Sequence, residues 1–220
     1  GLRVLGKPED FADYYYQNGA DELLYMDIVA SLYERNSLDD IISRTAKKVF
    51  IPLIVGGGLR TVEDIRRVLR AGADKVTINT AAIRNPQIIA DAANIFGSST
   101  ITVTIEAITS VDREGTGKSF DTELTQQLTQ AISIPVVACG GAGQASDVSD
   151  VVKTCDVQAV AIASIFHYEF IQKHKVLDGY SEGNIDFLKT AEIPKHFKSI
   201  TIQELKKHLY QEKIPCRYKA

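Results

Sequence analysis

The 220-residue chain is 45% hydrophobic and 24% charged, a composition that can bury a core and that excludes a disordered or fibrous protein. Its 25 lysines and arginines against 28 aspartates and glutamates give a net charge of -3, which provides no basic field for a nucleic-acid backbone. Cys139, Cys155 and Cys216 form no CxxC pair, so we expect neither a disulfide framework nor a thiolate zinc site. Without a membrane-length apolar run or a signal-peptide layout, the sequence predicts a soluble cytoplasmic protein with no membrane partner.

Short apolar runs alternate with amphipathic segments along the chain, and the runs end in polar or glycine residues. The predicted strands are 22–26, 51–55, 75–78, 101–105, 135–138 and 160–163, and two of the predicted helices are 8–17 and about 38–49. Thr61 and Asp64 form a capping box at the start of another helix, and Asn85 is expected to cap a further helix with Pro86 in its first turn. Strict alternation of helices with buried strands is typical of a parallel sheet in an α/β protein.

An internal repeat favours a closed barrel over an open sheet. The segment 51–58 matches the segment 134–141, an offset of 83 positions, as expected of duplicated βα units. Polar and glycine residues gather at the carboxyl ends of the predicted strands, where a (β/α)8 barrel keeps its active site. We therefore expect one (β/α)8 TIM-barrel domain over residues 1–220.

The alternation of strands and helices breaks once. Glu106 ends one predicted strand and residues 109–112 resemble the end of the next, yet only Ala107 and Ile108 separate them. A parallel crossover needs a dozen or more residues, so we infer that a helix and most of a strand, from the fifth and sixth βα units, are absent from this sequence. A complete barrel of about 250 residues also leaves room for a first strand before Gly1.

Two glycine-rich turns follow matching strands, at residues 56–58 and 140–143. Each turn is either a tight barrel corner or an anion site, in which backbone N–H groups and the start of the following helix approach a phosphate. Asn79, Thr80 and Ser164 end the strands that come next. Because the second turn repeats the first half a barrel away, the pattern favours a ligand with a phosphate at each end.

Carboxylates that end apolar strands are the candidate acid–base groups. Asp27 and Glu106 hold such positions, where a carboxylate either caps a helix or acts in the active-site mouth, since burying it unpaired is costly. None of the four histidines pairs at the spacing of metal ligands, and Cys139 fits a small core residue. We expect no metal.

Seven motifs spread along the chain carry a resemblance to a known family. They are the segments 21–23, 55–58, 72–76, 78–82, 109–116, 140–143 and 163–167. Together they resemble the cyclase subunit of imidazole glycerol phosphate synthase, and the segments 79–82 and 112–116 resemble it rather than the sister isomerase of the preceding histidine-pathway step. The resemblance implies a lyase that needs no cofactor and forms a heterodimer with a glutaminase. It would use the ammonia that this partner releases to convert a bis-phosphorylated ribulosyl nucleotide into imidazole glycerol phosphate and an aminoimidazole carboxamide ribonucleotide.

The resemblance also implies roles for individual residues at the two ends of the strands. The substrate- and phosphate-binding residues would be Asp27, Gly58, Asn79, Thr80, Thr109, Gly115, Gly140, Gly141, Ala163 and Ser164. At the opposite, amino-terminal face, Glu22 and Lys75 match members of the family's charged gate for ammonia, and Asp74 matches a residue that faces the glutaminase. Without the resemblance, these three charges would be interpreted as solvated side chains at strand starts.

Three departures from the family leave other functions open. The family's first-strand catalytic Asp would precede Gly1, Glu106 replaces its second catalytic Asp, and a C-terminal extension at about 168–198 precedes a closing helix near 201–213. The last two features resemble cyclase-like paralogues that supply ammonia for acetamidino-sugar formation in surface polysaccharide (lipopolysaccharide) biosynthesis. A third hypothesis is a non-catalytic scaffold that activates a glutaminase. An extra methylene displaces the carboxylate by about 1 Å, which can cost roughly 100-fold in rate, whereas the retained phosphate glycines count against a pure scaffold.

Overall fold

The computed structural model describes residues 7–27, 38–78, 81, 84–103, 115–131, 135–174, 194 and 196–218. The chain divides into two compact units, an N-terminal unit of Pro8–Glu106 and a C-terminal unit that combines Ala107–Ala220 with Gly1–Lys7. Each unit has a hydrophobic core of its own. Among the described residues, no helix is both long and apolar enough to cross a membrane.

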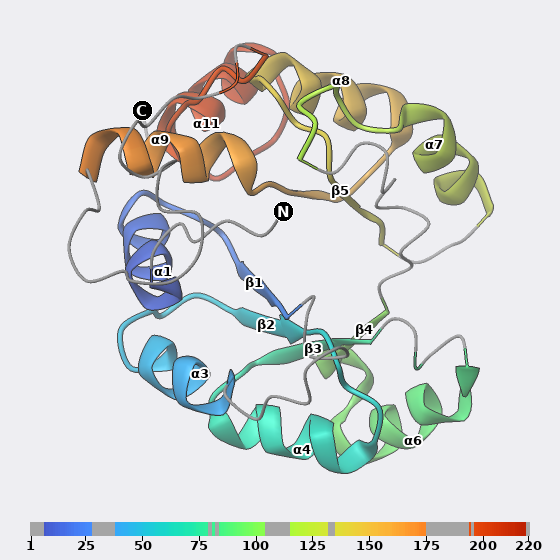
Figure 1. Ribbon diagram of the computed structural model, residues 1–220. Helices are drawn as coiled ribbons and strands as arrows, with labels where there is room; N and C mark the ends of the chain where they lie inside the picture. Colours follow the sequence, from blue (N-terminus) through green and yellow to red (C-terminus); the bar gives the residue numbers. More distant parts are fainter. Residues whose placement is uncertain are drawn as a thin grey trace. The chain divides into compact units, whose positions relative to one another are not determined.

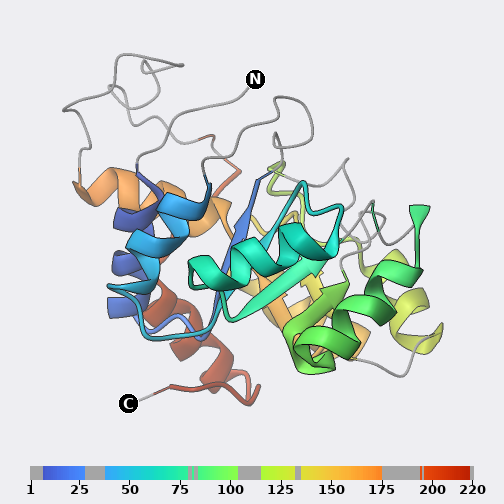
Figure 2. The same ribbon diagram turned by 90° about the horizontal axis from the view of Figure 1, so that it is seen from below.

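The N-terminal unit contains a four-stranded parallel sheet with the strand order β1-β2-β3-β4. Its elements are α1 (Pro8–Gln17), β1 (Leu23–Met26), α3 (Leu38–Ala46), β2 (Leu53–Gly56), α4 (Val62–Ala71), β3 (Lys75–Ile78), α6 (Gln87–Phe96), η1 (Ser98–Thr100) and β4 (Ile101–Val103). The helices lie along one side of the sheet (Figure 1), and Figure 2 shows α3, α4 and α6 on that same side from below. Consecutive strands are neighbours, as in one half of a (β/α)8 barrel.

Alternating burial along the strands explains this arrangement. Leu53 and Val55 of β2 are 2% and 0% exposed and pack in one core with Ile65 of α4. Successive side chains of a strand point to opposite faces of the sheet. On β1 the residues that alternate with the buried Leu23 are therefore on the other face, and Leu24 and Met26 remain 40% and 38% exposed.

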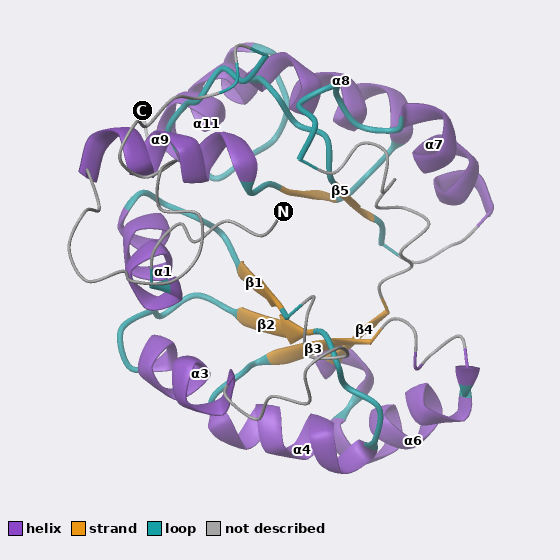
Figure 3. Ribbon diagram, in the orientation of Figure 1, coloured by secondary structure: helices purple, strands orange, loops and turns teal. Residues whose placement is uncertain are grey.

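The C-terminal unit contains the parallel strand pair β5–β6. Its elements are α7 (Thr122–Ala131), β5 (Val137–Cys139), α8 (Ala145–Cys155), β6 (Ala159–Ala161), α9 (Ser164–His174) and α11 (Ile202–Gln211). Figure 3 distinguishes these helices from the strands. Apolar residues of α8 and α11 share one core, and Lys153 of α8 binds Glu212 at the end of α11 with 2.6 Å between the charged atoms.

Two hydrogen-bond patterns of the N-terminal unit recur in the C-terminal unit, the first of them at the offset of 83 positions that the sequence predicts. The Asp64 carboxylate accepts the backbone N–H groups of the residues three and four positions before it, and Asp147, 83 positions later, does the same. In the second pattern, a backbone N–H at the start of one strand donates to the side chain of the residue that directly precedes the next strand. The Leu53 N–H donates to the Asp74 carboxylate at 2.9 Å, and the Val136 N–H donates to the Gln158 side-chain oxygen at 2.7 Å.

Most of the predicted elements are confirmed, and the differences are local. The α/β class with parallel strands is confirmed, as are the helix at residues 8–17 and the Thr61–Asp64 capping box. The predicted Asn85 cap is wrong, because Pro86 is the N-cap of α6 and no side chain caps this helix. Ser164 begins α9 rather than ending β6, and the predicted extension overlaps α9 as far as His174. Residues 175–193 of the extension lie outside the described part of the chain.

Candidate functional site

The first glycine turn (residues 56–58) packs against Asp27 at the end of β1. The Asp27 N–H donates to the Gly56 carbonyl at 2.9 Å. Gly57 and Gly58 have φ values of +94° and +68°, and a Cβ on Gly57 would lie 2.1 Å from the Asp27 carbonyl oxygen. Only glycine fits this position, which brings Asp27 directly beside the first glycine turn.

The carboxylate of Asp64 defines which backbone groups of this turn a ligand would meet. It accepts the N–H groups of Arg60 and Thr61 and the Thr61 hydroxyl at distances of 2.9–3.1 Å. Partial burial raises the pKa of Asp64, but these hydrogen bonds and Arg67 outweigh it, so the pKa lies below its usual value. The capping carboxylate is therefore charged at neutral pH, and an anion at this turn would meet the backbone of Gly57 and Gly58 rather than the capped N–H groups.

The second glycine turn (residues 140–143) packs against a loop from earlier in the chain. Gly140 and Gly141 have φ values of +87° and +100°. The Ser119 N–H donates to the Gly141 carbonyl at 2.9 Å, and a Cβ on Gly141 would lie 2.1 Å from the Ser119 carbonyl oxygen. A Cβ on Gly143 would lie 2.4 Å from the Gly117 carbonyl oxygen. The two backbones are therefore in direct contact at two points.

This loop, which we call the alternating loop (residues 115–119), has the backbone geometry of an anion site. Gly115, Gly117 and Ser119 have φ values of +67°, +63° and +72°, whereas the residues between them do not have positive φ. Alternation of this kind occurs in anion-binding concavities, where successive N–H groups turn toward one point. The N–H groups of Lys118 and Ser119 are already bonded, to the Thr116 hydroxyl and the Gly141 carbonyl, so the candidate donors of this loop are the N–H groups of residues 115–117. Ser119 adopts a conformation that is unfavourable for a side chain, and such strain is typical of functional sites. A Cβ on Gly115 would meet no atom within 4 Å, so the loop is open at this residue.

The third part of this site is the start of α9. Cys139 pairs with Ala161, so Gly140 and Ala163 follow neighbouring strand ends. Ala163 accepts the N–H groups of two residues in the first turn of α9, which begins at Ser164. The structure therefore brings four predicted residues of the C-terminal unit to the carboxyl end of one strand pair: Gly140, Gly141, Ala163 and Ser164. Gly115 belongs to the alternating loop, which contacts the second glycine turn through Gly117 and Ser119.

His167 of α9 adds no positive charge to this site. Burial lowers its pKa to about 4, so the imidazole is neutral at neutral pH. The start of α9 then offers an anion its backbone N–H groups and the Ser164 hydroxyl, and no charge from His167. Among the residues that the structure describes, no group of three or more His, Cys, Asp or Glu side chains could hold a metal ion.

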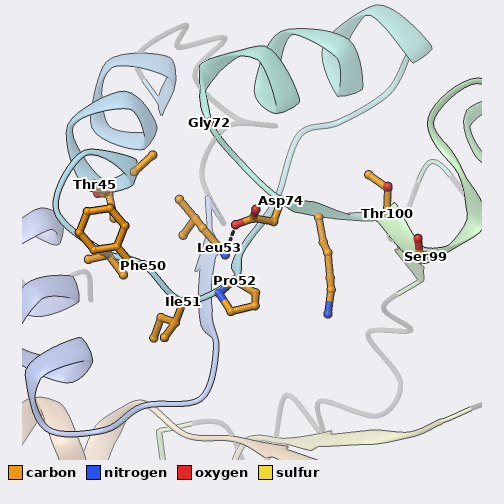
Figure 4. Close-up of a pocket in the computed structure, with 12 residues that line it drawn as sticks. Thr45, Phe50, Ile51, Pro52, Leu53, Gly72, Asp74, Ser99 and Thr100 are labelled. Atoms are coloured by element: carbon orange, nitrogen blue, oxygen red, sulfur yellow. Dashed lines mark hydrogen bonds between the residues drawn. The ribbon is translucent and has the colours of Figure 1, made fainter.

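Charged residues meet at the opposite, amino-terminal edge of the N-terminal sheet. Lys75 Nζ lies 3.0 Å from Glu22 Oε1, so the two predicted gate residues form an ion pair. Asp74 is held differently, because its carboxylate accepts the Leu53 N–H (Figure 4). Its own N–H donates to the Leu53 carbonyl at 2.9 Å, which fixes Asp74 on the sheet.

A cavity of about 650 Å³ opens beside these charges. Its lining includes Phe50, Pro52, Asp74, Lys75 and Thr100. Figure 4 shows Phe50, Pro52, Asp74 and Thr100 around the cavity. Phe50 is 77% exposed, which is unusual for an aromatic side chain in a folded unit. The amino-terminal edge thus combines a charged pair with an exposed aromatic ring.

Some of the predicted residues lie outside the described part of the chain, namely Asn79, Thr80, Glu106 and Thr109. Conversely, the structure adds Gly117, Ser119 and Phe197 to the residues around the second glycine turn of the C-terminal unit. In the sequence, Gly115 and Gly117 with one residue between them are the pattern that could have indicated the alternating loop. Nothing in the sequence indicates that Phe197 contacts it, because that contact joins residues 80 positions apart.

Comparison with known proteins identifies relatives over most of the chain. The family model "Histidine biosynthesis protein" matches residues 1–110 and 107–172. Imidazole glycerol phosphate synthase subunit HisF of Legionella pneumophila is 45% identical over 183 residues, covering 66% of this chain and 86% of the relative. The same subunit of Methanopyrus kandleri is 38% identical over 225 residues (76% and 83%), and that of Methanococcus vannielii is 33% identical over 243 residues (84% and 89%).

These alignments bear on the break in the predicted pattern of strands and helices. The match to Methanopyrus kandleri extends over 225 positions, more than the 220 residues of this chain, although only 76% of the chain takes part. The relative therefore contains residues that have no counterpart here. The two matches of the family model meet at residues 107–110, where the sequence lacks a crossover.

Proposed function

Because the chain belongs to the histidine biosynthesis protein family, we propose that it is an enzyme, the cyclase subunit of imidazole glycerol phosphate synthase. It uses ammonia from a glutaminase partner in the cytoplasm to convert a bis-phosphorylated ribulosyl aminoimidazole carboxamide nucleotide to imidazole glycerol phosphate. The observation that carries the proposal is 33–45% identity to curated cyclase subunits over 83–89% of their length. No observation favours the sugar-amidating paralogue or the scaffold over this function.

In this proposal, backbone groups of each unit bind one phosphate of the substrate. The first glycine turn with Gly58, Asn79 and Thr80 takes one phosphate. The alternating loop, the second glycine turn and Ser164 take the other. Support comes from the positive φ values of both turns, a backbone geometry that can turn N–H groups toward an anion. Asp27, beside the first glycine turn, lines the same substrate pocket.

Glu106 is the proposed general acid or base of the reaction, acting with a first-strand Asp that the family implies. Replacing it with Gln keeps its size and its hydrogen bonding but removes proton transfer. With an ammonium salt as nitrogen source, we expect Glu106→Gln to lower kcat by about 100-fold or more. If the parent enzyme is active and Glu106→Gln leaves its rate unchanged, Glu106 is only a cap at a strand end.

The phosphate role of Gly115 can be tested against a matched control. Gly115→Ala and Gly97→Ala both place a side chain at positive φ, +67° and +91°, and a Cβ meets no atom closer than 4.0 Å at either position. With ψ at +143°, Gly97 has a backbone conformation that side chains rarely adopt, so Gly97→Ala is a demanding control for backbone strain. Only the Cβ of Gly115→Ala would occupy the opening of the alternating loop, so we expect this variant to raise KM about tenfold and Gly97→Ala to leave it unchanged. Equal KM values in the two variants would contradict the phosphate site.

The glutaminase is proposed to bind the amino-terminal edge of the N-terminal unit. Support comes from the Glu22–Lys75 ion pair, the neighbouring Asp74 and the exposed Phe50 beside a cavity of about 650 Å³. Aromatic residues at the centre of an interface commonly contribute most of its affinity. Ammonia would enter at the same edge, past the charged pair.

A further inference from the structure

Residues 196–200 lie against the phosphate site of the C-terminal unit. Lys198 donates its backbone N–H to the Gly143 carbonyl at 2.8 Å, which ties the segment to the second glycine turn. Ser199 Oγ lies 3.1 Å from Gln172 Oε1 of α9, which ties it to the helix that begins at Ser164. Gln172 lies eight residues after Ser164, near the end of α9, so this stretch contacts the second glycine turn directly and α9 at some distance from the site.

Phe197 supplies the contact with the third part, the alternating loop. Its side chain is buried, with 7% exposed, and its ring lies 4.9 Å from the ring of Tyr168 on α9 in an edge-to-face arrangement. A Cβ on Gly117 would lie 2.8 Å from His196 Cδ2 and 3.0 Å and 3.2 Å from two Phe197 ring atoms. The ring therefore packs directly against the backbone of Gly117, and little space separates the two.

These contacts form a continuous stack. The Phe197 ring supports Gly117, the Gly117 carbonyl contacts Gly143, and the Gly143 carbonyl accepts the N–H of Lys198. Ser119, whose φ of +72° is unfavourable for a side chain, lies in the same loop. A loop with three positive φ values in five residues keeps its shape only when its surroundings hold it there.

We propose that Phe197 is a positioning residue that holds the alternating loop in its anion-binding conformation. Phe197 does not touch the ligand; it fixes the N–H groups of residues 115–117 that do. The C-terminal end of the extension therefore contributes to the affinity of this site for a phosphate group. This inference rests on the proposed function, because the ligand it concerns is one phosphate of the bis-phosphorylated substrate.

The test compares three substitutions in the full-length protein. Phe197→Ala removes the ring, and Phe197→Leu keeps an apolar side chain and serves where Phe197→Ala does not fold. Ser199→Ala is the matched control, because it removes a hydrogen bond from the same segment on the side that faces α9. Each protein is titrated with inorganic phosphate by calorimetry, and KM and kcat are measured with an ammonium salt as nitrogen source.

We expect Phe197→Ala to raise the Kd for phosphate and the KM for the substrate about tenfold while kcat changes less than twofold. Loss of a binding contact remote from the reacting atoms has this signature, whereas partial unfolding lowers kcat and leaves KM unchanged. The Kd and KM of Phe197→Leu should lie between those of Phe197→Ala and the parent, and those of Ser199→Ala should match the parent. Unchanged Kd and KM in both Phe197 variants would overturn the inference and make Phe197 an ordinary core residue.

A double-mutant cycle gives a second measurement. Gly117→Ala would place its Cβ 2.8 Å from His196 Cδ2 and 3.0 Å from the Phe197 ring, so its effect on phosphate affinity should become smaller, without vanishing, once Phe197→Ala has removed the ring. Independent, multiplicative effects would contradict the contact. A parent protein that binds phosphate but shows no cyclase turnover would refute the proposed function, and the Kd series would still decide the role of Phe197. A parent that binds no phosphate would overturn this inference.

Discussion

The carboxylate of Asp74 and the amide of Gln158 hold equivalent places in the two units. Each side-chain oxygen accepts a backbone N–H of the preceding strand, and each residue donates its own N–H to the carbonyl of the same strand residue. An amide therefore performs in one unit what a carboxylate performs in the other. The oxygen of Asp74 is required by the sheet, and its charge is available for another purpose.

This equivalence separates the structural role of Asp74 from its proposed role in docking. Asp74→Asn keeps an acceptor oxygen, as Gln158 does, and should retain the parent's stability while weakening the complex with the glutaminase. Asp74→Leu leaves the Leu53 N–H without this acceptor and should cost about 1–3 kcal/mol in the free energy of unfolding. Urea unfolding and a binding titration measure the two effects. Equal affinity of Asp74→Asn and the parent would show that its charge has no part in the interface.

A second prediction at this scale concerns the buried His167. Because burial lowers its pKa to about 4 from 6.5, the unfolded chain binds a proton between these pH values and the folded chain does not. Stability therefore falls as the pH drops below 6.5, by about 2 kcal/mol between pH 7 and pH 5. His167→Gln removes this contribution, so urea unfolding at the two pH values should show a smaller loss than in the parent. An identical loss in both proteins would refute it.

At the scale of the elements, what could be predicted from the sequence was local. Thr61 and Asp64 are three positions apart, and the hydrogen bonds that they form depend only on the first turn of α4. Asn85 failed as a cap because Pro86 takes the N-cap position and backbone carbonyls accept the N–H groups of the first turn of α6. The contact between Phe197 and Gly117 depends on tertiary packing, which a single sequence does not encode as a pattern.

The capping box of α4 allows a quantitative test. Thr61→Ala removes the hydroxyl that accepts the Asp64 N–H, and we expect a loss of about 1 kcal/mol, or roughly 2–4 °C in Tm. Thr129→Ala on α7 is the control, since its hydroxyl only donates to a carbonyl of the same helix. Scanning calorimetry of both variants checks the prediction. A loss as large in Thr129→Ala would mean that the cap contributes nothing of its own.

At the scale of the whole molecule, the amino-terminal edge predicts how the two subunits communicate. Phe50 is 77% exposed, so Phe50→Ala should leave Tm unchanged and weaken glutaminase binding about tenfold or more. Glutamine-dependent turnover should fall, whereas turnover with ammonium salt should not. Ile95→Ala, on α6 and 51% exposed, removes apolar surface that does not line the cavity and should change neither activity. Equal losses in the two variants would exclude Phe50 as a specific contact.

The repeated hydrogen bonds between strands have a consequence for how the chain begins to fold. The Leu53–Asp74 and Val136–Gln158 bonds join residues only 21 and 22 positions apart. Closing so short a loop costs little chain entropy and does not require residues from a distant part of the polypeptide. During synthesis, the sheet around β2 can therefore form before the ribosome has produced β5. The second half would later repeat the same step with its own strands, so each half of the chain can begin to order from its own local contacts.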